Sequence, residues 1–465
     1  MGQPVAVVLA AGMGTRMRSK LPKVLHKLIG VPMINHVVNT LYEAGINNII
    51  VVVGYRGELV EEVLDKNCRV VFQKEQLGTG HALLQALPAL SGYAEGDCLV
   101  VCGDTPLLKA RTLEQLRDKH RISGARATVL TACLPDPTGY GRIIKGPGGI
   151  ERIVEEKDAS LQEKAVKEIN TGTYCFNIDS LVQELGRLTT SNAQGEYYLT
   201  DIIKRLVDKK ERVETMLLDN PDEAAGINNR VQMAQAEAVL RQDILVRHML
   251  QGVTIINPEH TYVEAGVKIG KDTVLYPGTI LEGATSIGED CVIGPDTRIV
   301  DSVIENGVEV KYSYLIKARV AGGCTIGPFS FLRPGSVLAA GVKVGDFVEV
   351  KNSYVGEGSK IPHLSYIGDS TLGQEVNIGA GTITCNYDGT AKHHTRIGDG
   401  AFIGSNTNLV APISVGAGAY IGAGSTVTRD VPDGALAVAR GRQKTVENWR
   451  SRSAKTSGSD KDGED

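Results

Sequence analysis

A repeat of six residues in the C-terminal half constrains the fold of this 465-residue chain more than any other feature. Aliphatic side chains recur in steps of six from Val263 to Ile299, again from Ile326 to Val350, and again from Ile397 to Val427. This spacing fits neither an α-helix, with about 3.6 residues per turn, nor an alternating strand, with a period of about two. It fits a hexapeptide repeat, in which each unit forms a short strand and a turn and points one aliphatic side chain inward.

The hexapeptide repeat predicts a parallel β-helix. Three hexapeptides per coil over residues 255–430 give about ten coils, and strands of successive coils would hydrogen-bond about 4.8 Å apart. The period itself does not determine the handedness of the coil. The segment Thr382–Gly389 begins a loop that interrupts the ladder before Ile397. We assign residues 251–450 to this domain.

The N-terminal half, residues 1–228, alternates short apolar runs with helical patterns. Strands are expected at Pro4–Ala10, Asn48–Val53, Arg69–Phe72, Asp97–Cys102, Ala127–Ala132 and Tyr174–Asn177. Helices are expected at Pro32–Ala44, Glu58–Leu64, Thr79–Ala89 and Arg111–Ser123. This alternation predicts an α/β, Rossmann-like domain with a mainly parallel sheet and helices on both faces. Ligands bind such sheets at the carboxyl ends of the strands.

Two further segments have their own composition. Residues 229–250 contain neither Gly nor Pro and are rich in Ala, Gln, Arg and Val, which predicts a linker helix. Residues 451–465 are polar and charged, which predicts a disordered tail.

Charge and cysteine content narrow the class of protein. The chain has 50 Lys plus Arg against 54 Asp plus Glu, a net charge of −4, which argues against binding to nucleic acid or to an anionic membrane. No apolar run approaches the roughly 18 residues of a transmembrane helix, and the N-terminus reads as a strand rather than a signal peptide. The eight Cys form no CxxC pair, which favours reduced thiols and a cytoplasmic protein.

A glycine-bearing loop, Leu9–Arg16, follows the first expected strand. Gly12 and Gly14 would let backbone N–H groups approach a polyphosphate, and Arg16 and Lys23 would supply cations. A plain structural turn is the alternative. Asp104, after another apolar strand, suits Mg²⁺, although a helix N-cap before Pro106 is an equal alternative.

Polar residues also break the hexapeptide pattern. Arg333 and Lys351 place cations beside the ladder, and His363 is the histidine that lies within the repeat rather than in a helix or loop. A neutral imidazole could take a proton from an amine during acyl transfer. A lone His in this position is more often structural, and it is the neighbouring cations that favour chemistry.

The motifs of the N-terminal half occur in the order LAAGMGTRM, PK, Q…LGTG, GD, TGYGR, EEKD and NTG. This order resembles the sugar-1-phosphate nucleotidylyltransferases. Joined to hexapeptide repeats, and over the chain to about residue 449, it resembles the family of bacterial bifunctional N-acetylglucosamine-1-phosphate uridylyltransferases/glucosamine-1-phosphate N-acetyltransferases. That family implies a left-handed β-helix and a homotrimer.

The resemblance implies roles for residues of the N-terminal half. Uridine would be bound by Leu9, Ala10, Ala11, Gly12, Gln73, Gly78 and Thr79, beside Cys102, Gly103 and Asp104. Gly141, Glu155 and Asn170 would hold N-acetylglucosamine. Asp104 and Asn228 would be the Mg²⁺ ligands, and Arg16 and Lys23 would neutralise phosphate charge. Without the resemblance, Glu155 would be interpreted as a solvated charge.

The resemblance also implies roles in the C-terminal half. His363 would be the catalytic base, and Arg333, Lys351, Tyr366 and Asn377 would bind glucosamine 1-phosphate. Acetyl-CoA would contact Ala380, Asn386, Tyr387, Ser405, Ala423 and Arg440. The chain departs from the family at Ala391, usually Asn, at His394, often Lys, and at Asp346, where Asn is common.

The expected function is therefore bifunctional synthesis of UDP-N-acetylglucosamine from glucosamine 1-phosphate, acetyl-CoA and UTP. Two alternatives remain. One is a nucleotidylyltransferase whose β-helix only mediates oligomerisation or regulation, which would not need His363, Arg333 and Lys351. The other is a sensor of nucleotide sugars without activity, which should have lost Arg16, Lys23 or Asp104.

Overall fold

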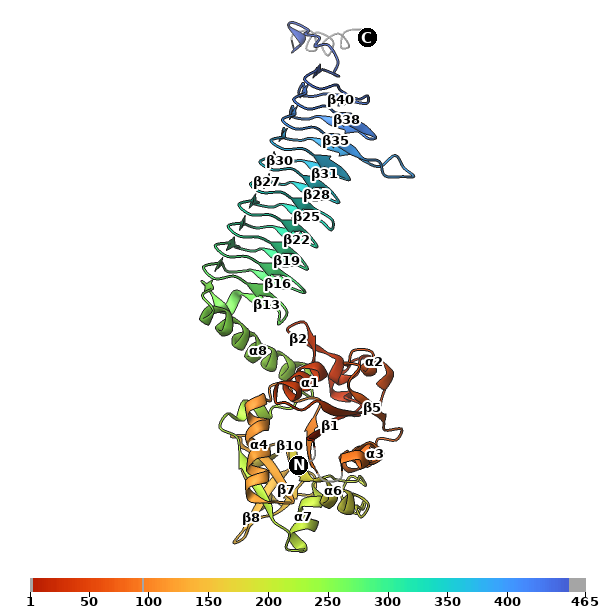
Figure 1. The fold of residues 1–465 in the computed structure, drawn as a ribbon, viewed down its shortest axis with the longest axis vertical. Helices are drawn as coiled ribbons and strands as arrows, with labels where there is room; N and C mark the ends of the chain where they lie inside the picture. The colour runs from red at the N-terminus through yellow and green to blue at the C-terminus, as the bar shows by residue number, and fades with distance from the viewer. Residues whose placement is uncertain (1–2, 94–95, 451–465) are drawn as a thin grey trace, which may run out of the picture. The chain divides into compact units, whose positions relative to one another are not determined.

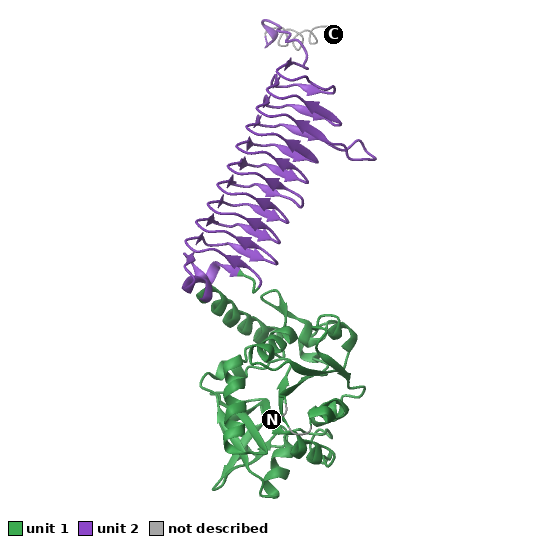
Figure 2. Cartoon of the chain, in the orientation of Figure 1, with its two compact units in different colours: residues 1–246, 263–265 green, residues 247–262, 266–465 purple. Residues whose placement is uncertain are grey.

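The computed structural model describes residues 3–93 and 96–450, so the expected tail at 451–465 lies outside the described residues. The chain forms two compact units, shown in green and purple in Figure 2. One consists of residues 1–246 with 263–265, and the other of residues 247–262 with 266–465. Each is described below by itself.

A mixed sheet runs through the first unit, in the order β11-β7-β10-β6-β1-β4-β5. These strands are β1 Val5–Ala10, β4 Asn48–Val53, β5 Arg69–Phe72, β6 Asp97–Cys102, β7 Ala127–Cys133, β10 Glu168–Asn177 and β11 Val213–Leu217. The pairs β1·β4, β1·β6, β4·β5 and β7·β11 are parallel, and β10 lies antiparallel between β6 and β7. The predicted α/β sheet is confirmed, with one antiparallel strand inserted in it.

Strand β10 begins six residues before the predicted Tyr174. The polar residues Asn170, Thr171 and Thr173 hide the strand from an apolar-run pattern, and the pairing with β7 shifts register between Asn170 and Tyr174. The sequence analysis also missed β11 and the hairpin of β8 Arg142–Gly146 and β9 Gly149–Val154. These strands are short or partly polar and lack a long apolar run.

Helices cover both faces of the sheet, as predicted. They are α1 Met33–Glu43, α2 Gly57–Glu61, α3 Thr79–Leu90, α4 Ala110–Ser123, α5 Leu161–Lys164, α6 Ile178–Leu185 and α7 Asp201–Asp208. Alternate residues of β1 enter different cores: Val5 and Val7 pack in the core with α3, α6 and α7, and Ala6 and Val8 in the core with α1 and α4. This double burial explains why the strands read as continuous apolar runs. The linker helix α8 spans Arg230–Leu250, one residue shorter than predicted.

The second unit is a parallel β-helix of three sheets with eleven, ten and nine strands, in agreement with the expected ten coils (Figure 1). The strands used below are β25 Phe331–Leu332, β27 Lys343–Asp346, β28 Glu349–Lys351, β30 Lys360–His363, β31 Tyr366–Gly368, β33 Asn377–Ile378 and β34 Ile383–Cys385. Leu332 pairs with Val350 and Val350 with Ile367, and all three side chains are fully buried. The repeated aliphatics are therefore the interior column of the coils.

The interruption of the ladder is a loop, as predicted. Leu372 of β32, Ser370–Leu372, pairs with Ile397 of β35, Thr395–Ile397, instead of with a residue 17 or 18 positions on. The extra residues between β34 and β35 form the loop that projects from the coils in Figure 1.

Candidate active sites

The first candidate site lies at the carboxyl ends of β1 and β6, where a parallel sheet usually binds ligands. A cavity of about 480 Å³ opens there. Its lining includes ten residues expected from the sequence: Leu9, Ala10, Ala11, Gly12, Lys23, Gln73, Gly78, Thr79, Cys102 and Asp104. The amide of Gly103 donates to the Leu9 carbonyl at 2.9 Å and ties the two strand ends together.

Four residues distant in the sequence meet at the edge of this cavity. The Lys23 ammonium contacts the carboxylate of Asp104 and donates to Asn228 Oδ1 at 3.2 Å. Arg16 Nη2 donates to the same Asn228 oxygen at 2.8 Å. The amide of Ile227 donates to the Asp104 carbonyl at 2.9 Å, which holds Asn228 beside Asp104.

This arrangement has the donor set of a magnesium site. A carboxylate oxygen of Asp104 and an amide oxygen of Asn228 converge on one cationic group, the Lys23 ammonium. Hard oxygen donors of this kind are those that Mg²⁺ prefers. The residues therefore fit the ion that the sequence suggested.

Gly14 makes the approach of Lys23 possible. It has φ +62°, and a Cβ atom at this position would lie 2.6 Å from Lys23 Cβ. A larger residue would be strained and would push the Lys23 side chain away. The glycine therefore serves the packing of the cation as well as the turn.

Gln73 and Thr79 contribute to the wall of the cavity. Gln73 is buried, and its Nε2 atom donates to the Gly78 carbonyl at 3.3 Å. The Thr79 hydroxyl accepts from the Leu199 amide at 3.2 Å, which anchors a segment that the sequence analysis did not consider. Gly78 has φ +105°, and a Cβ there would lie 2.7 Å from the Tyr197 carbonyl oxygen.

Gly141, Glu155 and Asn170 also come together. The backbone N–H of Asn170 donates to the Gly141 carbonyl at 2.9 Å. A Cβ atom on Gly141 would lie 3.5 Å from Glu155 Oε2. The Glu155 carboxylate accepts from the Thr200 hydroxyl at 3.0 Å. Burial raises the pKa of Glu155 above its usual value, so this side chain is not a freely solvated charge.

Cys102 lies between these two groups of residues. Its thiol donates to the Gly172 carbonyl at 3.6 Å, and burial raises its pKa to about 12. A thiol with this pKa stays protonated at neutral pH and is a poor nucleophile. Cys102 therefore shapes the site without attacking the substrate.

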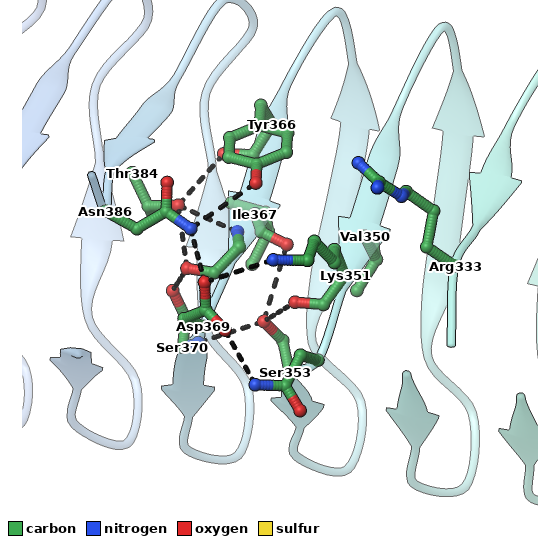
Figure 3. A network of polar contacts seen from close by, with 12 residues as sticks. Arg333, Val350, Lys351, Ser353, Tyr366, Ile367, Asp369, Ser370, Thr384 and Asn386 are labelled. Carbon is green, nitrogen blue, oxygen red and sulfur yellow. Dashed lines mark hydrogen bonds and ion pairs between the residues drawn. The ribbon is translucent and has the colours of Figure 1, made fainter. Parts of the chain in front are cut away.

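The second candidate site is a polar network on the β-helix, shown in Figure 3. At its centre is the nearly buried carboxylate of Asp369, which accepts from Asn352 Nδ2 at 2.6 Å and from Asn386 Nδ2 at 2.5 Å. Lys351 Nζ lies 3.4 Å from Asp369 Oδ2. Burial by itself would raise the pKa of Asp369, but these hydrogen bonds and the lysine lower it below the usual value. Asp369 is thus a charged anchor for the expected residues Lys351 and Asn386.

Three cations gather near this anchor. Arg333 donates to Glu349 Oε1 at 2.8 Å, and Lys351 contacts Lys392 of the projecting loop. The contact with Lys351, together with the charges of Lys351 and Arg333, lowers the pKa of Lys392. Positive groups that repel one another in this way favour an anionic ligand such as a phosphate.

His363 lies at the end of β30, and its Nδ1 atom is 2.5 Å from Asp346 Oδ1 on β27. Tyr366 begins the next strand, β31, and its hydroxyl accepts from Asn386 Nδ2 at 3.4 Å. Asn377 is on β33, which pairs with β30 through Lys360. His363, Tyr366 and Asn377 are thus on the same or adjacent coils.

Four of the expected acetyl-CoA residues occupy one column over successive coils. The Asn406 amide donates to the Ala380 carbonyl at 2.7 Å, and the Gly424 amide donates to the Ser405 carbonyl at 2.8 Å. Arg440 Nη1 donates to the Ala423 carbonyl at 2.6 Å. Tyr387 instead lies in the projecting loop, where its hydroxyl donates to the Gly389 carbonyl at 2.6 Å.

Family models match three parts of the chain. Residues 6–141 match the MobA-like NTP transferase domain, residues 255–355 match the GMPPB C-terminal domain, and residues 394–429 match the bacterial transferase hexapeptide of six repeats.

Full-length relatives match nearly the whole chain. The Bifunctional protein GlmU of Carboxydothermus hydrogenoformans is 54% identical over 95% of this chain and 99% of the relative. The protein of the same name from Heliobacterium modesticaldum is 53% identical over 98% and 100%, and that from Pelotomaculum thermopropionicum is 56% identical over 96% and 97%. This chain belongs to the GlmU family.

Membership of the GlmU family agrees with the domain order read from the sequence. An NTP transferase domain precedes a left-handed parallel β-helix of the hexapeptide transferase type, and the chain is a bifunctional enzyme. In the described part of the chain, no helix is both long and apolar enough to cross a membrane.

Sequence reasoning missed several residues of this GlmU-family chain that support the expected ones. They are Thr200, which binds Glu155; Asp369 and Asn352, which anchor Lys351 and Asn386; and Asp346, whose departure from the family pattern had no assigned consequence. Of these residues, only Asp369 could have been found from the sequence. It is a charged residue that directly follows Ile367 and Gly368, at a turn of the hexapeptide repeat.

Proposed function

We propose that this chain makes UDP-N-acetylglucosamine from glucosamine 1-phosphate in two reactions, one at each candidate site. The C-terminal site transfers acetyl from acetyl-CoA to the amine, and the N-terminal site then transfers uridylyl from UTP and releases pyrophosphate. The observation that supports this most is that one chain holds a Lys23–Asp104–Asn228 cluster beside a nucleotide-sized cavity and a separate cluster of three cations on the β-helix.

In uridylyl transfer, the phosphate oxygen of N-acetylglucosamine 1-phosphate attacks the α-phosphorus of UTP in line, and pyrophosphate leaves. No protein nucleophile is required, because positioning and charge neutralisation carry most of such a reaction. Arg16 and Lys23 would neutralise phosphate charge. Asp104 and Asn228 would hold Mg²⁺, which stabilises charge on the phosphates when it is bound.

The remaining residues of the first site would orient the substrates. Leu9–Gly12, Gln73, Gly78 and Thr79 would contact the uridine, since they line the cavity. Gly141, Glu155 and Asn170 would hold the N-acetylglucosamine unit. Thr200 supports this sugar-binding group through its hydrogen bond to Glu155.

In acetyl transfer, Arg333 and Lys351 would bind the phosphate of glucosamine 1-phosphate, with Tyr366 and Asn377 beside them. Lys392 would join this phosphate site, since its ammonium contacts Lys351. His363 would take a proton from the amine as the amine attacks the thioester carbonyl. Acetyl-CoA would lie along the column of Ala380, Ser405, Ala423 and Arg440, with Asn386 and Tyr387 at its end.

A homotrimer is the oligomer that we propose, because hexapeptide domains of this type associate and this β-helix exposes an apolar ladder. The rings of Tyr312, Phe329 and Phe347 lie against one another on successive coils, with 41%, 56% and 59% of their surface exposed. Leu364 follows on the next coil, 58% exposed. Exposed patches of this kind mark protein interfaces. Sedimentation velocity should give about three times the mass of one chain, whereas a monomer would exclude the trimer.

The eight cysteines are free thiols, which supports a reducing compartment, and we place the enzyme in the cytoplasm. Its product would supply cell-wall and surface-polysaccharide synthesis. The alternative of a β-helix that only mediates oligomerisation does not explain the cluster of Arg333, Lys351 and Lys392. The alternative of an inactive sensor does not explain why Arg16, Lys23 and Asp104 are all retained.

A dropout assay on the full-length chain tests the proposal. Glucosamine 1-phosphate, acetyl-CoA, UTP and Mg²⁺ are combined, each is omitted in turn, and UDP-N-acetylglucosamine is measured by mass. Product should require all four, and N-acetylglucosamine 1-phosphate should restore it when acetyl-CoA is missing. If product forms only when the acetylated sugar is supplied, and never from glucosamine 1-phosphate and acetyl-CoA, the β-helix is not an acetyltransferase.

Two variants assign the reactions to the two sites. His363→Ala should abolish release of the CoA thiol and leave pyrophosphate release unchanged, and Asp104→Ala should do the reverse, each by about 100-fold or more. Loss of both activities in either variant, while it remains folded, would contradict the separation of the sites.

A further inference from the structure

Asp346 and His363 are neighbours across two coils of the β-helix. They are register partners in the parallel pair β27·β30, and Asp346 Oδ1 lies 2.5 Å from His363 Nδ1. The amide of Leu364 donates to the Asp346 carbonyl at 2.9 Å, which fastens the two backbones at the same level. The strand pairing therefore places the carboxylate against one particular nitrogen of the imidazole.

The other imidazole nitrogen is open to a substrate. The His363 side chain is 56% exposed, and within the described residues its Nε2 atom has no hydrogen-bond partner. An imidazole that donates its Nδ1 hydrogen to a carboxylate keeps an unprotonated Nε2. Asp346 therefore selects the tautomer in which Nε2 can accept a proton.

We propose that Asp346 is a positioning residue for acetyl transfer, which holds His363 with Nδ1–H toward its carboxylate and Nε2 toward the amine of the substrate. This inference rests on the proposed function of the C-terminal site. It adds a residue to that site for which the sequence suggested no role.

The proton balance of the step follows from this orientation. The neutral amine attacks the thioester carbonyl carbon, the C–N bond forms, and an amine proton passes to His363 Nε2. The C–S bond then breaks, and the departing CoA sulfur takes a proton from the imidazolium. The Asp346 carboxylate stabilises the imidazolium between these transfers without being protonated itself.

Among the described residues of strands β27, β30 and β33, Asp346 is the charged residue opposite His363. The hydrogen bond from His363 lowers the pKa of Asp346, which keeps the carboxylate ionised at neutral pH. The other charged residues of these two strands, Lys343 and Lys360, are register partners of each other at the far end of the pair. On the adjoining strand β33, the residue beside Lys360 is the uncharged Asn377.

A purely structural role for the pair predicts a different result. Both side chains are substantially exposed, and an exposed ion pair contributes little to stability. Removing the carboxylate should therefore change acetyl transfer much more than it changes folding. The pH profile separates the two roles, because a structural contact would not move it.

The test compares Asp346→Ala and Asp346→Asn with the wild-type full-length chain. We expect Asp346→Ala to lower kcat of CoA thiol release about tenfold, part of the 10²–10⁴-fold that a general base contributes, with little change in KM. In both variants the pH profile of kcat/KM should change, because the negative charge beside the imidazole is lost. Pyrophosphate release on the same samples should be unchanged.

Matched controls make the result decisive. Asp301→Asn removes a carboxylate that also bonds across coils, to the Ala284 amide at 3.0 Å, and should leave acetyl transfer and its pH profile unchanged. NMR of ¹⁵N-labelled histidines, with His363→Gln to assign the signal, should show the Nδ1–H tautomer in the wild type and a shift toward Nε2–H in Asp346→Ala.

The outcomes distinguish this inference from the proposed function. Full acetyl transfer in His363→Ala would overturn the proposed function. An inactive His363→Ala together with unchanged kinetics and pH profile in Asp346→Ala would overturn the positioning role alone. An Nε2–H tautomer in the wild type would also overturn it.

Discussion

At the scale of single residues, Glu155 shows how the fold changes the chemistry of a side chain. In the sequence it stands in the charged run Glu155-Glu156-Lys157-Asp158 and reads as solvated. In the structure it accepts from the buried Thr200 hydroxyl, and desolvation raises its pKa. An ionised carboxylate in this place lowers the stability of the folded protein, so we attribute its presence to function.

Glu155→Gln should therefore stabilise the protein at high pH. Because the folded-state pKa lies above the unfolded value of about 4.5, the penalty is absent below that pH, grows as pH rises through the window up to the raised pKa, and is complete above it. The variant should melt higher than the wild type at pH 8 and no higher at pH 4.5. Each kcal/mol gained in the free energy of unfolding should raise Tm by about 2–4 °C.

The same variant should raise the KM for the sugar phosphate in uridylyl transfer by roughly 10–100-fold. This factor corresponds to the usual free energy of a charge-assisted hydrogen bond. Differential scanning fluorimetry and pyrophosphate release measure the two effects. The control is Glu151→Gln, at an exposed position of strand β9, which ends directly before Glu155. An equal stabilisation at both pH values would contradict the desolvation argument.

At the scale of elements, the β-helix and the sheet differ in what their sequences reveal. Each coil repeats the same pattern, so strand positions in the hexapeptide region follow from the period. Strand β10 has no such repeat, and its shift of register at Asn170 depends on pairing with β7. Asn170 lies at this shift and donates its backbone N–H to the Gly141 carbonyl, so the irregular part of the strand carries a residue of the candidate site.

Leu332→Ala should destabilise the second unit by about 2–5 kcal/mol, because it leaves a cavity in the buried column of Leu332, Val350 and Ile367. Acetyl transfer should be lost at a lower temperature, whereas uridylyl transfer should keep its wild-type thermal profile. Activity measured after a temperature series tests this. Tyr354→Ala, which truncates a side chain that is 46% exposed, should have little effect.

At the scale of the whole molecule, each compact unit holds one of the candidate sites. A soluble intermediate, N-acetylglucosamine 1-phosphate, would connect the two reactions. Diffusion of this intermediate is the simplest link between them.

Two inactive variants should consequently restore each other. A mixture of separately purified His363→Ala and Asp104→Ala proteins should make UDP-N-acetylglucosamine from glucosamine 1-phosphate after a lag, while neither makes it alone. The lag should shorten as both concentrations rise. If the mixture stays inactive although each variant keeps its one activity, the intermediate must pass within a single assembly.

Patterns that are local in the sequence were sufficient to predict the fold class of both halves of this protein. The hexapeptide period and the α/β alternation were enough for the fold class, because each depends on neighbours close in the chain. Most of the expected site residues came from the motif order, through the family that it resembles. The meeting of Lys23, Asp104 and Asn228 was decided by the order of strands in the sheet. The contacts of Asp369 with Lys351 and of Asp346 with His363 were decided by the coil register, which sets one residue opposite another 17 or 18 positions away. Such pairings depend on how distant segments pack, and no local pattern encodes them.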